Sequence, residues 1–282
     1  LPLKSLTEAR QVVDKLIEYD LKLSTAGSWQ NEFLFVGDDG DFNIHQNQAD
    51  QLANSIELYD PVFTARKFYL DNFDQIENPN GQFSPAAQKS LDLEIRRGAL
   101  IVNFTGHGSE RVWMDERILD ETIIKNWNQG PRYPLFLTAT CEFGRNDDPL
   151  QISSGEYTLL QKNGGSIAIV TTARPVSAST NFTLNKAFYE AFFMKENNQF
   201  RNLGSIFRDT KNNSLSGVSN RNFSLLGDPS MKLALYEHEV VIDEIKTAEG
   251  GDEIKALSKV SITGHVERNN VTSTNFNGII NL

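Results

Sequence analysis

One histidine and one cysteine each follow a short apolar run. His107 comes after Ile101-Val-Asn-Phe-Thr-Gly, and Cys141 comes after Pro134-Leu-Phe-Leu-Thr-Ala-Thr. Such runs are typical of buried strands, and the carboxyl ends of parallel strands meet at one edge of an open α/β sheet. An imidazole beside a thiol can take its proton and later return it to a leaving group. The pair therefore predicts nucleophilic catalysis by a cysteine.

The same two residues also have a purely structural interpretation. Cys141 is the only cysteine of the chain, so no internal disulfide includes it, and lone cysteines are commonly buried as apolar filler. His107 taken singly fits a loop histidine with satisfied hydrogen bonds. Together, with glycine on both sides of His107 and small residues before Cys141, they favour catalysis.

Composition limits the classes of partner. The 282 residues suffice for one large domain plus a small one, and the formal net charge is −10 with no cluster of Lys or Arg. This charge argues against nucleic acid and against an anionic membrane surface, so a protein, peptide or small molecule is expected. No apolar run approaches the roughly 18 residues of a membrane span. The start at Leu1 lacks the regions of a signal peptide, which suggests a mature segment or a fragment.

Strands and helices alternate through the first part of the chain. Strands are predicted at residues 33–36, 62–70, 101–105, 134–140 and 166–172, and helices at 5–19, 48–58, 84–98, 118–127, 154–163, 181–195 and 203–212. This order predicts an α/β fold, a three-layer α-β-α sandwich with a mostly parallel sheet.

The pattern changes near residue 237. Short β-like runs at 240–245, 259–266 and 277–280 alternate with polar turns. The segment is shorter than the roughly 100 residues of a β-sandwich. We therefore expect an α/β domain at residues 1–236 and the start of a second, β domain at 237–282.

Several motifs resemble the gingipain family of cysteine peptidases. They are Thr105-Gly-His-Gly-Ser-Glu110 with Trp113 close behind, the cysteine at the end of the next strand, and Leu226-Gly-Asp-Pro-Ser230. The segments 138–144 and 172–176 are most similar to the family's sortase of the type IX secretion system. The similarity covers about residues 1 to 236. It implies a caspase-like domain followed by an immunoglobulin-like domain, with the family's upstream α/β subdomain absent from this chain.

The resemblance also implies roles for individual residues. His107 becomes the general base and acid, and Cys141 the nucleophile. The backbone amides of Gly108 and Cys141 bind the oxyanion, a role that suits Gly108 because substrate can approach a backbone without a Cβ.

Some relatives orient the imidazole with an acidic residue after the first strand. The match falls on Asp38, Asp39 and Asp41, and the spacing does not fix which of them acts. We choose Asp39.

The same acidic turn has competing interpretations. Asp39, Asp41 and Asn43 alternate as calcium ligands do, with Asp50 at the twelfth position, but Ile44 replaces the glycine that an EF-hand needs. An EF-hand is therefore not expected. A looser metal site stays open because clustered carboxylates repel one another unless screened, and a solvated turn is the default. No metal ligand and no cofactor is assigned.

The loop after the next strand is expected to line the substrate site. In the relatives that cut after Lys or Arg, this loop supplies a Trp and, in the Lys-specific case, an acid. Residues 174–180 have neither, and Arg174 repels a basic side chain. We expect Arg174, Ser177, Thr180 and Trp113 to contact substrate. Strict Lys/Arg specificity is not expected; a small or polar residue before the cut, or one with an acidic neighbour, fits better.

The predicted function is a cysteine-dependent peptidase or acyl transferase. Water resolving the thioester makes a protease, and an amine makes a sortase-like transpeptidase. The resemblance implies the second: removal of a secreted cargo's C-terminal signal and its attachment to lipopolysaccharide, at the outer membrane surface of a Gram-negative bacterium and with secretion partners there. A plain secreted endopeptidase and an inactive binding scaffold remain alternatives.

The other histidines are predicted to be surface residues. His45, His238 and His265 lie in polar contexts without ligand spacing. No phosphate-binding loop occurs, so nucleotide binding is not expected.

Overall fold

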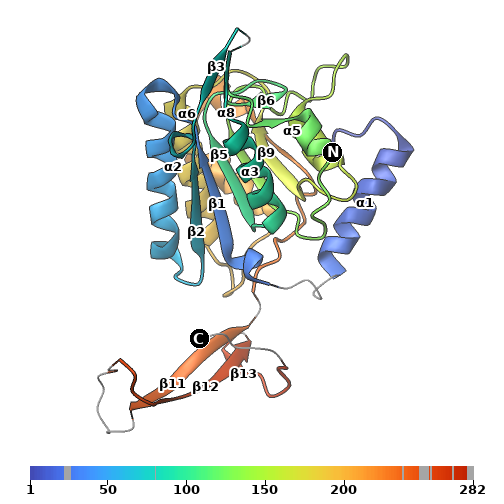
Figure 1. Cartoon of the computed structure of the whole chain (residues 1–282). Helices are drawn as coiled ribbons and strands as arrows, with labels where there is room; N and C mark the ends of the chain where they lie inside the picture. The colour runs from blue at the N-terminus through green and yellow to red at the C-terminus, as the bar shows by residue number, and fades with distance from the viewer. Residues whose placement is uncertain are drawn as a thin grey trace. The chain divides into compact units, whose positions relative to one another are not determined.

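The computed structural model describes residues 1–21, 27–79, 81–236, 238–247, 254, 256–268 and 270–277 (Figure 1). The chain separates into two compact units, Leu1–Leu235 and Tyr236–Leu282. Of the helices in these ranges, none has the length and apolar character needed to cross a membrane.

A six-stranded sheet forms the centre of the larger unit, in the order β10-β9-β8-β5-β1-β2. All neighbours are parallel except β10, which is antiparallel to β9. The predicted mostly parallel sheet is confirmed, and the antiparallel edge strand was not predicted. The strands are β1 (Glu32–Gly37), β2 (Thr64–Tyr69), β5 (Ile101–Thr105), β8 (Leu135–Ala139), β9 (Ala168–Thr172) and β10 (Phe223–Leu226).

Helices flank both faces of this sheet (Figure 1). They are α1 (Leu6–Leu21), α2 (Gly40–Tyr59), α3 (Pro85–Arg97), α4 (Glu121–Lys125), α5 (Ser154–Leu160), α6 (Ala178–Phe193), α7 (Leu203–Asn213) and α8 (Gly217–Arg221). Short elements complete the unit: the 3-10 turns η2 (Ser28–Asn31) and η3 (Leu70–Asn72), and the hairpins β3 (Ile76–Asn78) with β4 (Gly81–Phe83) and β6 (Val112–Trp113) with β7 (Leu119–Asp120).

The two sides of β1 show how the layers form. Successive side chains of a strand point to opposite faces. Phe33 packs against the aromatic rings of α6, including Tyr189 and Phe192, on one face. Leu34 and Val36 belong to a buried cluster on the other face that includes residues of α3, α4 and α5. Because both faces are covered, every residue of β1, β5, β8 and β9 is buried.

The strand order reverses between β1 and β5. The chain passes from β1 to β2 on one side, and β5 then lies on the other side of β1. Open α/β sheets bind ligands beyond the carboxyl ends of the strands at such a reversal. Asp38 directly follows β1, and His107 lies two residues after β5, so both are placed at this crevice.

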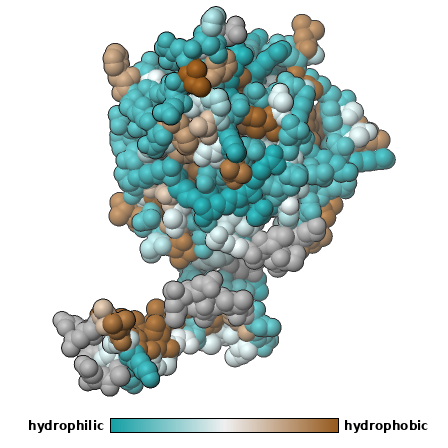
Figure 2. Space-filling model, in the orientation of Figure 1, coloured by the Kyte–Doolittle hydropathy of each residue, from teal (hydrophilic) through white to brown (hydrophobic). Residues whose placement is uncertain are grey.

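The smaller unit consists of β structure. Its sheet consists of β11 (Glu239–Thr247), β12 (Val260–Arg268) and β13 (Val271–Thr272), paired antiparallel. The predicted run at 277–280 lies outside the described residues except for Asn277. None of the described residues in this unit is buried. Figure 2 shows a brown apolar patch on it, whereas the larger unit is mostly hydrophilic in the same view.

Candidate functional site

The register of the sheet aligns the histidine and the cysteine. Thr105 of β5 is paired with Ala139 of β8, and His107 and Cys141 each lie two residues beyond that pair. The two loops also touch, since a Cβ built on Gly108 would lie 2.5 Å from Oγ1 of Thr140. The carboxyl edge of the sheet therefore brings the histidine loop and the cysteine loop side by side.

Cys141 lies at the surface of this edge. The residue is half-buried and free, and its Sγ lies 3.6 Å from the backbone oxygen of Val176, to which it donates a hydrogen bond. Val176 belongs to the loop between β9 and α6, which the sequence predicted to line the substrate site. The thiol is thus held between two loops at the sheet edge.

Two carboxylates hold His107. Oδ2 of Asp41 lies 3.2 Å from Nε2 of the ring, and Oδ2 of Asp38 accepts the backbone N–H of His107 at 2.7 Å. The other oxygen of Asp38 accepts the Gly40 N–H at 3.0 Å. Gly40 itself lies under the ring, because a Cβ there would be 2.8 Å from Cδ2 of His107. Backbone and ring are therefore fixed by separate groups.

Asp39, chosen from the sequence to orient the imidazole, forms no hydrogen bond or ion pair with His107 among the described residues. Its Oδ2 instead accepts a hydrogen bond from Gln75 at 2.5 Å. The reason is the backbone: Asp41, Phe42 and Asn43 have left-handed φ angles of 54°, 56° and 62°. This turn directs Asp41 back toward the ring, so Asp41 takes the position expected for Asp39.

His45 is buried rather than exposed, which corrects the prediction of a surface histidine. Only 4% of the residue is accessible. Its ring meets that of His107 edge to face, with centroids 5.0 Å apart and planes at 81°, and its Nε2 lies 3.6 Å from Oδ2 of Asp41. Burial lowers the pKa of His45, and the nearby Asp38 carboxylate opposes this. The prediction failed because the regular turns of α2 start directly after Asn43 and include His45, whereas the sequence placed the helix start near residue 48.

Among the described residues, two groups of side chains have the composition and spacing to bind a metal ion. In each, the ligand atoms lie within 4.8 Å of one another: Asp41, His45 and His107 in one, and Asp38, Asp39 and Glu116 in the other. Burial raises the pKa of Glu116 and of Asp38, and in Glu116 the neighbouring carboxylates add to this effect.

The EF-hand interpretation does not fit the structure. Asn43 donates a hydrogen bond to Asp71 at 2.5 Å. Asp50 accepts hydrogen bonds from Lys67 and Tyr69 on β2. Both side chains therefore point to β2 or η3 partners and not to a shared loop centre.

Two backbone amides at the edge are available to a substrate. Within the described part of the chain, the N–H groups of Gly108 and Cys141 make no hydrogen bond to the protein. In the loop that contains Gly108, the N–H of Ser109 donates to the backbone oxygen of Val112, and the N–H of Met114 donates to that of His107. Two such donors beside a thiol can stabilise a negatively charged oxygen.

Trp113 lies in the core and not at the surface. It is completely buried and stacks on Phe104 with ring centroids 4.3 Å apart. The structure therefore corrects the prediction that Trp113 contacts substrate. The backbone of Trp113 nevertheless borders the histidine loop, because a β-bridge pairs Trp113 with Gly108, the residue after His107.

Ser177 and Thr180 both belong to the start of α6. The hydroxyl of Ser177 accepts the Thr180 N–H at 3.3 Å and so caps this helix. Ser177 is exposed and Thr180 half-buried. They are placed next to Val176, the residue that the Cys141 thiol contacts.

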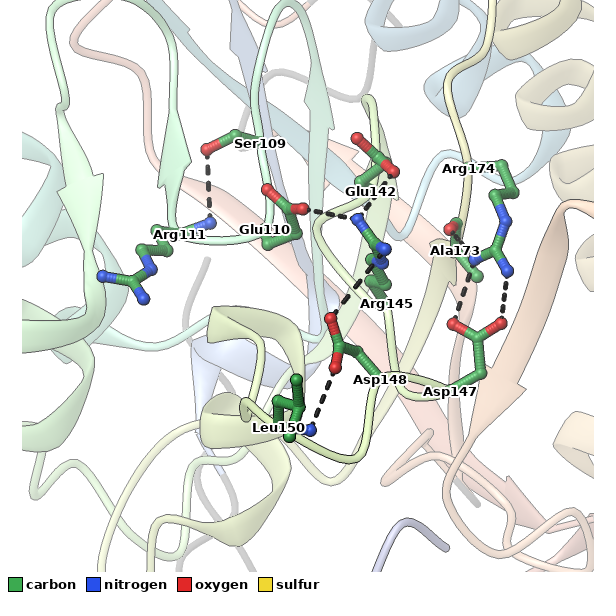
Figure 3. Close-up of polar contacts among 10 residues, drawn as sticks. All are labelled: Ser109, Glu110, Arg111, Glu142, Arg145, Asp147, Asp148, Leu150, Ala173 and Arg174. Atoms are coloured by element: carbon green, nitrogen blue, oxygen red, sulfur yellow. Dashed lines mark hydrogen bonds and ion pairs between the residues drawn. The ribbon is translucent and has the colours of Figure 1, made fainter.

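Arg174 forms a bidentate ion pair. Its guanidinium donates to the two carboxylate oxygens of Asp147 at 3.0 and 2.5 Å, as Figure 3 shows. This pairing lowers the pKa of Asp147 and raises that of Arg174. From the sequence alone Arg174 was expected to be an uncompensated charge, but in the fold Asp147 offsets it.

Arg145 links the histidine loop with the cysteine loop. Its Nη1 lies 2.8 Å from Oε1 of Glu110 and 3.4 Å from Oε1 of Glu142, and its Nη2 lies 3.8 Å from Asp148 (Figure 3). Glu110 follows His107 and Glu142 follows Cys141 in the chain. The cross-link to the histidine loop was not predicted from the sequence because Arg145 and Glu110 lie 35 residues apart.

Comparison with solved structures gives the same fold. Residues covering 85% of this chain match the crystal structure of the Arg-specific cysteine proteinase gingipain R (RgpB), with TM-score 0.67 and 19% identity. A complex of Porphyromonas gingivalis RgpB pro- and mature domains matches with TM-score 0.66 and 17% identity over the same share. The chain spans 56% and 58% of the length of these two structures. Among curated proteins, none matches the sequence.

The sequence also matches the model of a protein family. The match to peptidase family C25 extends over residues 1–234, which is almost the whole larger unit. Together with the fold, it shows that the chain belongs to peptidase family C25, the gingipain family of cysteine peptidases.

Proposed function

We propose that this chain is a cysteine peptidase domain in which Cys141 is the nucleophile and His107 the general base and acid. The observation that supports this most directly is the register of β5 with β8, which aligns the two residues at one edge of the sheet. The contact of Gly108 with Thr140 keeps the two loops together.

The reaction begins when the Cys141 thiol loses its proton to His107. Because Nε2 of the ring faces Asp41, Nδ1 is the nitrogen that remains for the thiol. The thiolate attacks the peptide carbonyl, a C–S bond forms, and the negative charge moves to the carbonyl oxygen. The amides of Gly108 and Cys141 donate to that oxygen.

Collapse of this intermediate breaks the C–N bond. The imidazolium of His107 gives its proton to the departing amine, and the acyl group remains on Cys141 as a thioester. Attack by water releases an acid, whereas attack by an amine forms a new amide. In both cases His107 takes the proton of the attacking group, and the thiol is regenerated.

Iodoacetamide alkylation tests the pair without knowledge of the substrate. At about pH 6 the parent chain is expected to react far faster than the variant His107→Ala, because an imidazolium stabilises a thiolate beside it. His265→Ala is the matched control, since His265 is on the smaller unit between Asp243 and Glu267. Equal rates in the parent chain and His107→Ala would contradict the proposed pair.

For the finer activity we propose the sortase of the type IX secretion system. Supporting it are the resemblances at residues 138–144 and 172–176, which contain Cys141 and Arg174. In this proposal the enzyme acts at the outer membrane surface of a Gram-negative bacterium. It removes the C-terminal signal of a secreted cargo and transfers the cargo to an amine of lipopolysaccharide, with secretion proteins as partners.

The fate of the thioester distinguishes the sortase from a plain secreted protease. A reporter peptide with a cargo C-terminal signal is incubated with the chain and a small primary amine, and the products are resolved by mass spectrometry. The sortase gives an amide of the added amine, in an amount that rises with amine concentration. Formation of free acid alone, at every amine concentration, favours the protease, and failure to cleave despite normal alkylation favours a binding scaffold.

A further inference from the structure

His45 is a buried polar side chain that the proposed mechanism does not use. It is 4% exposed, and neither ring nitrogen makes a hydrogen bond with the described residues. Buried polar atoms are usually paired with a donor, an acceptor, a water or an ion. An imidazole in this condition, placed against a second imidazole and a carboxylate, points to a ligand that joins all three.

The spacing of the three side chains suits one metal ion. Oδ2 of Asp41 lies 3.2 Å from Nε2 of His107 and 3.6 Å from Nε2 of His45. The three ligand atoms all lie within 4.8 Å of one another. Around Zn²⁺, with bonds near 2.1 Å, the ligands of a tetrahedron lie about 3.4 Å apart. The widest pair, at most 4.8 Å apart, would have to close by at most about 1.4 Å to bring all three ligand atoms onto one ion.

We propose that Asp41, His45 and His107 form an inhibitory site for Zn²⁺. Two imidazoles and one carboxylate are ligands that Zn²⁺ accepts readily, whereas Ca²⁺ and Mg²⁺ prefer oxygen. Three protein ligands leave the fourth position to water. The adjacent acidic group of Asp38, Asp39 and Glu116 adds negative charge that favours a cation here.

The bound ion stops the reaction through His107. A neutral imidazole that coordinates through Nε2 carries its one proton on Nδ1. The nitrogen that faces the thiol is then already protonated and cannot accept the proton of Cys141. Inhibition therefore needs no bond between the metal and sulfur, and removal of the ion restores the base. This consequence rests on the proposed function, while metal binding itself does not.

Titration of the full chain with Co²⁺, as a coloured substitute for Zn²⁺, tests the site. We expect one bound ion per chain, visible d–d absorption that Zn²⁺ displaces, and no near-ultraviolet band of a thiolate ligand. His45→Gln and Asp41→Asn should each weaken binding by at least about tenfold. Cys141→Ser and the matched control His265→Gln should bind as the parent chain does.

Alkylation tests the catalytic pair and the effect of the metal separately. In metal-free buffer, the contrast between the parent chain and His107→Ala tests the catalytic pair. With Zn²⁺ added, alkylation of the parent chain should slow at least tenfold and recover with a chelator, and alkylation of His45→Gln should slow much less at the same Zn²⁺ concentration. Three results would overturn the proposal. They are absence of Co²⁺ binding, a thiolate band that disappears in Cys141→Ser, and Zn²⁺ inhibition that is equal in the parent chain, His45→Gln and Asp41→Asn. Asp41 is exposed, so Asp41→Asn keeps the test valid if His45→Gln does not fold.

Discussion

The carboxylate of Asp41 lies 3.2 Å from Nε2 of His107, and it reaches this position from a residue with left-handed backbone. Asp38, three residues earlier, holds the backbone N–H of the same histidine. One short segment after β1 thus fixes both the main chain and the ring of the proposed general base. The aspartate that lies between them in sequence, Asp39, bonds to Gln75 instead.

Asp41→Asn should slow alkylation of Cys141 only modestly. The side chains of Asp41 and His107 are 60% and 44% exposed, so solvent screens the pair and limits it to about 1 kcal/mol, or roughly fivefold in rate. The rate is measured at about pH 6 without metal. Asp39→Asn is the matched control and should leave it unchanged; a larger loss in Asp39→Asn than in Asp41→Asn would show that the sequence-based choice was right.

Gly40→Ala should slow alkylation more than Asp41→Asn does. The new methyl group would lie 2.8 Å from Cδ2 and 3.2 Å from Nε2 of His107, which forces the ring to move. Misplacement of a catalytic group by about 1 Å can cost on the order of 100-fold. Gly217→Ala is the control, because a Cβ at Gly217 would meet no other atom, although the φ of 63° at this position adds local backbone strain. Full activity of Gly40→Ala with an unchanged melting temperature would contradict this packing.

Arg145→Gln should lower the rate of alkylation while leaving the melting temperature nearly unchanged. The guanidinium joins Glu110 to Glu142, and each partly exposed pair contributes at most about 1 kcal/mol to stability. The lower rate is expected because the histidine loop and the cysteine loop are no longer held in the same relative position. Arg111→Gln is a suitable control, because Figure 3 shows the Arg111 side chain extending away from this network. Comparable rates in the two variants would argue against a positioning role.

Glu116→Gln should stabilise the larger unit at neutral pH. Burial raises the pKa of Glu116 in the folded state. The protonated side chain therefore contributes to stability in full below the unfolded pKa of about 4.3, and this contribution is lost as the pH rises through the folded pKa. At pH 7 the folded chain carries a buried carboxylate beside Asp38 and Asp39. Denaturant unfolding at pH 4 and pH 7 should show the variant's advantage only at the higher pH. The control Asp115→Asn, at the exposed neighbouring position, should gain much less stability at pH 7. If Glu116→Gln were stabilised as much at pH 4 as at pH 7, the buried charge of Glu116 would not be the cause.

Much of the fold could be predicted because its signals are local. The apolar runs before His107 and Cys141 are long enough to identify buried strands, and their alternation with helices implies a mostly parallel sheet. The missed elements are short or lie at the sheet edge and include the edge strand β10, the β3–β4 and β6–β7 hairpins and helix α8. The start of α2 was missed because three left-handed residues precede its regular turns.

The sequence by itself determined that a thiol and an imidazole each follow a buried strand, and that both lie at the carboxyl edge of the sheet. One thiol and one imidazole after two parallel strands leave little choice, because side-chain reactivity and strand direction are properties of short segments. The tertiary structure alone decided which groups surround them. Asp41 replaced Asp39 through a backbone turn, His45 was buried by the helix on which it lies, and Arg145 met Glu110 across 35 residues of chain. Such contacts depend on how distant segments pack, and a single sequence carries no local signal for them.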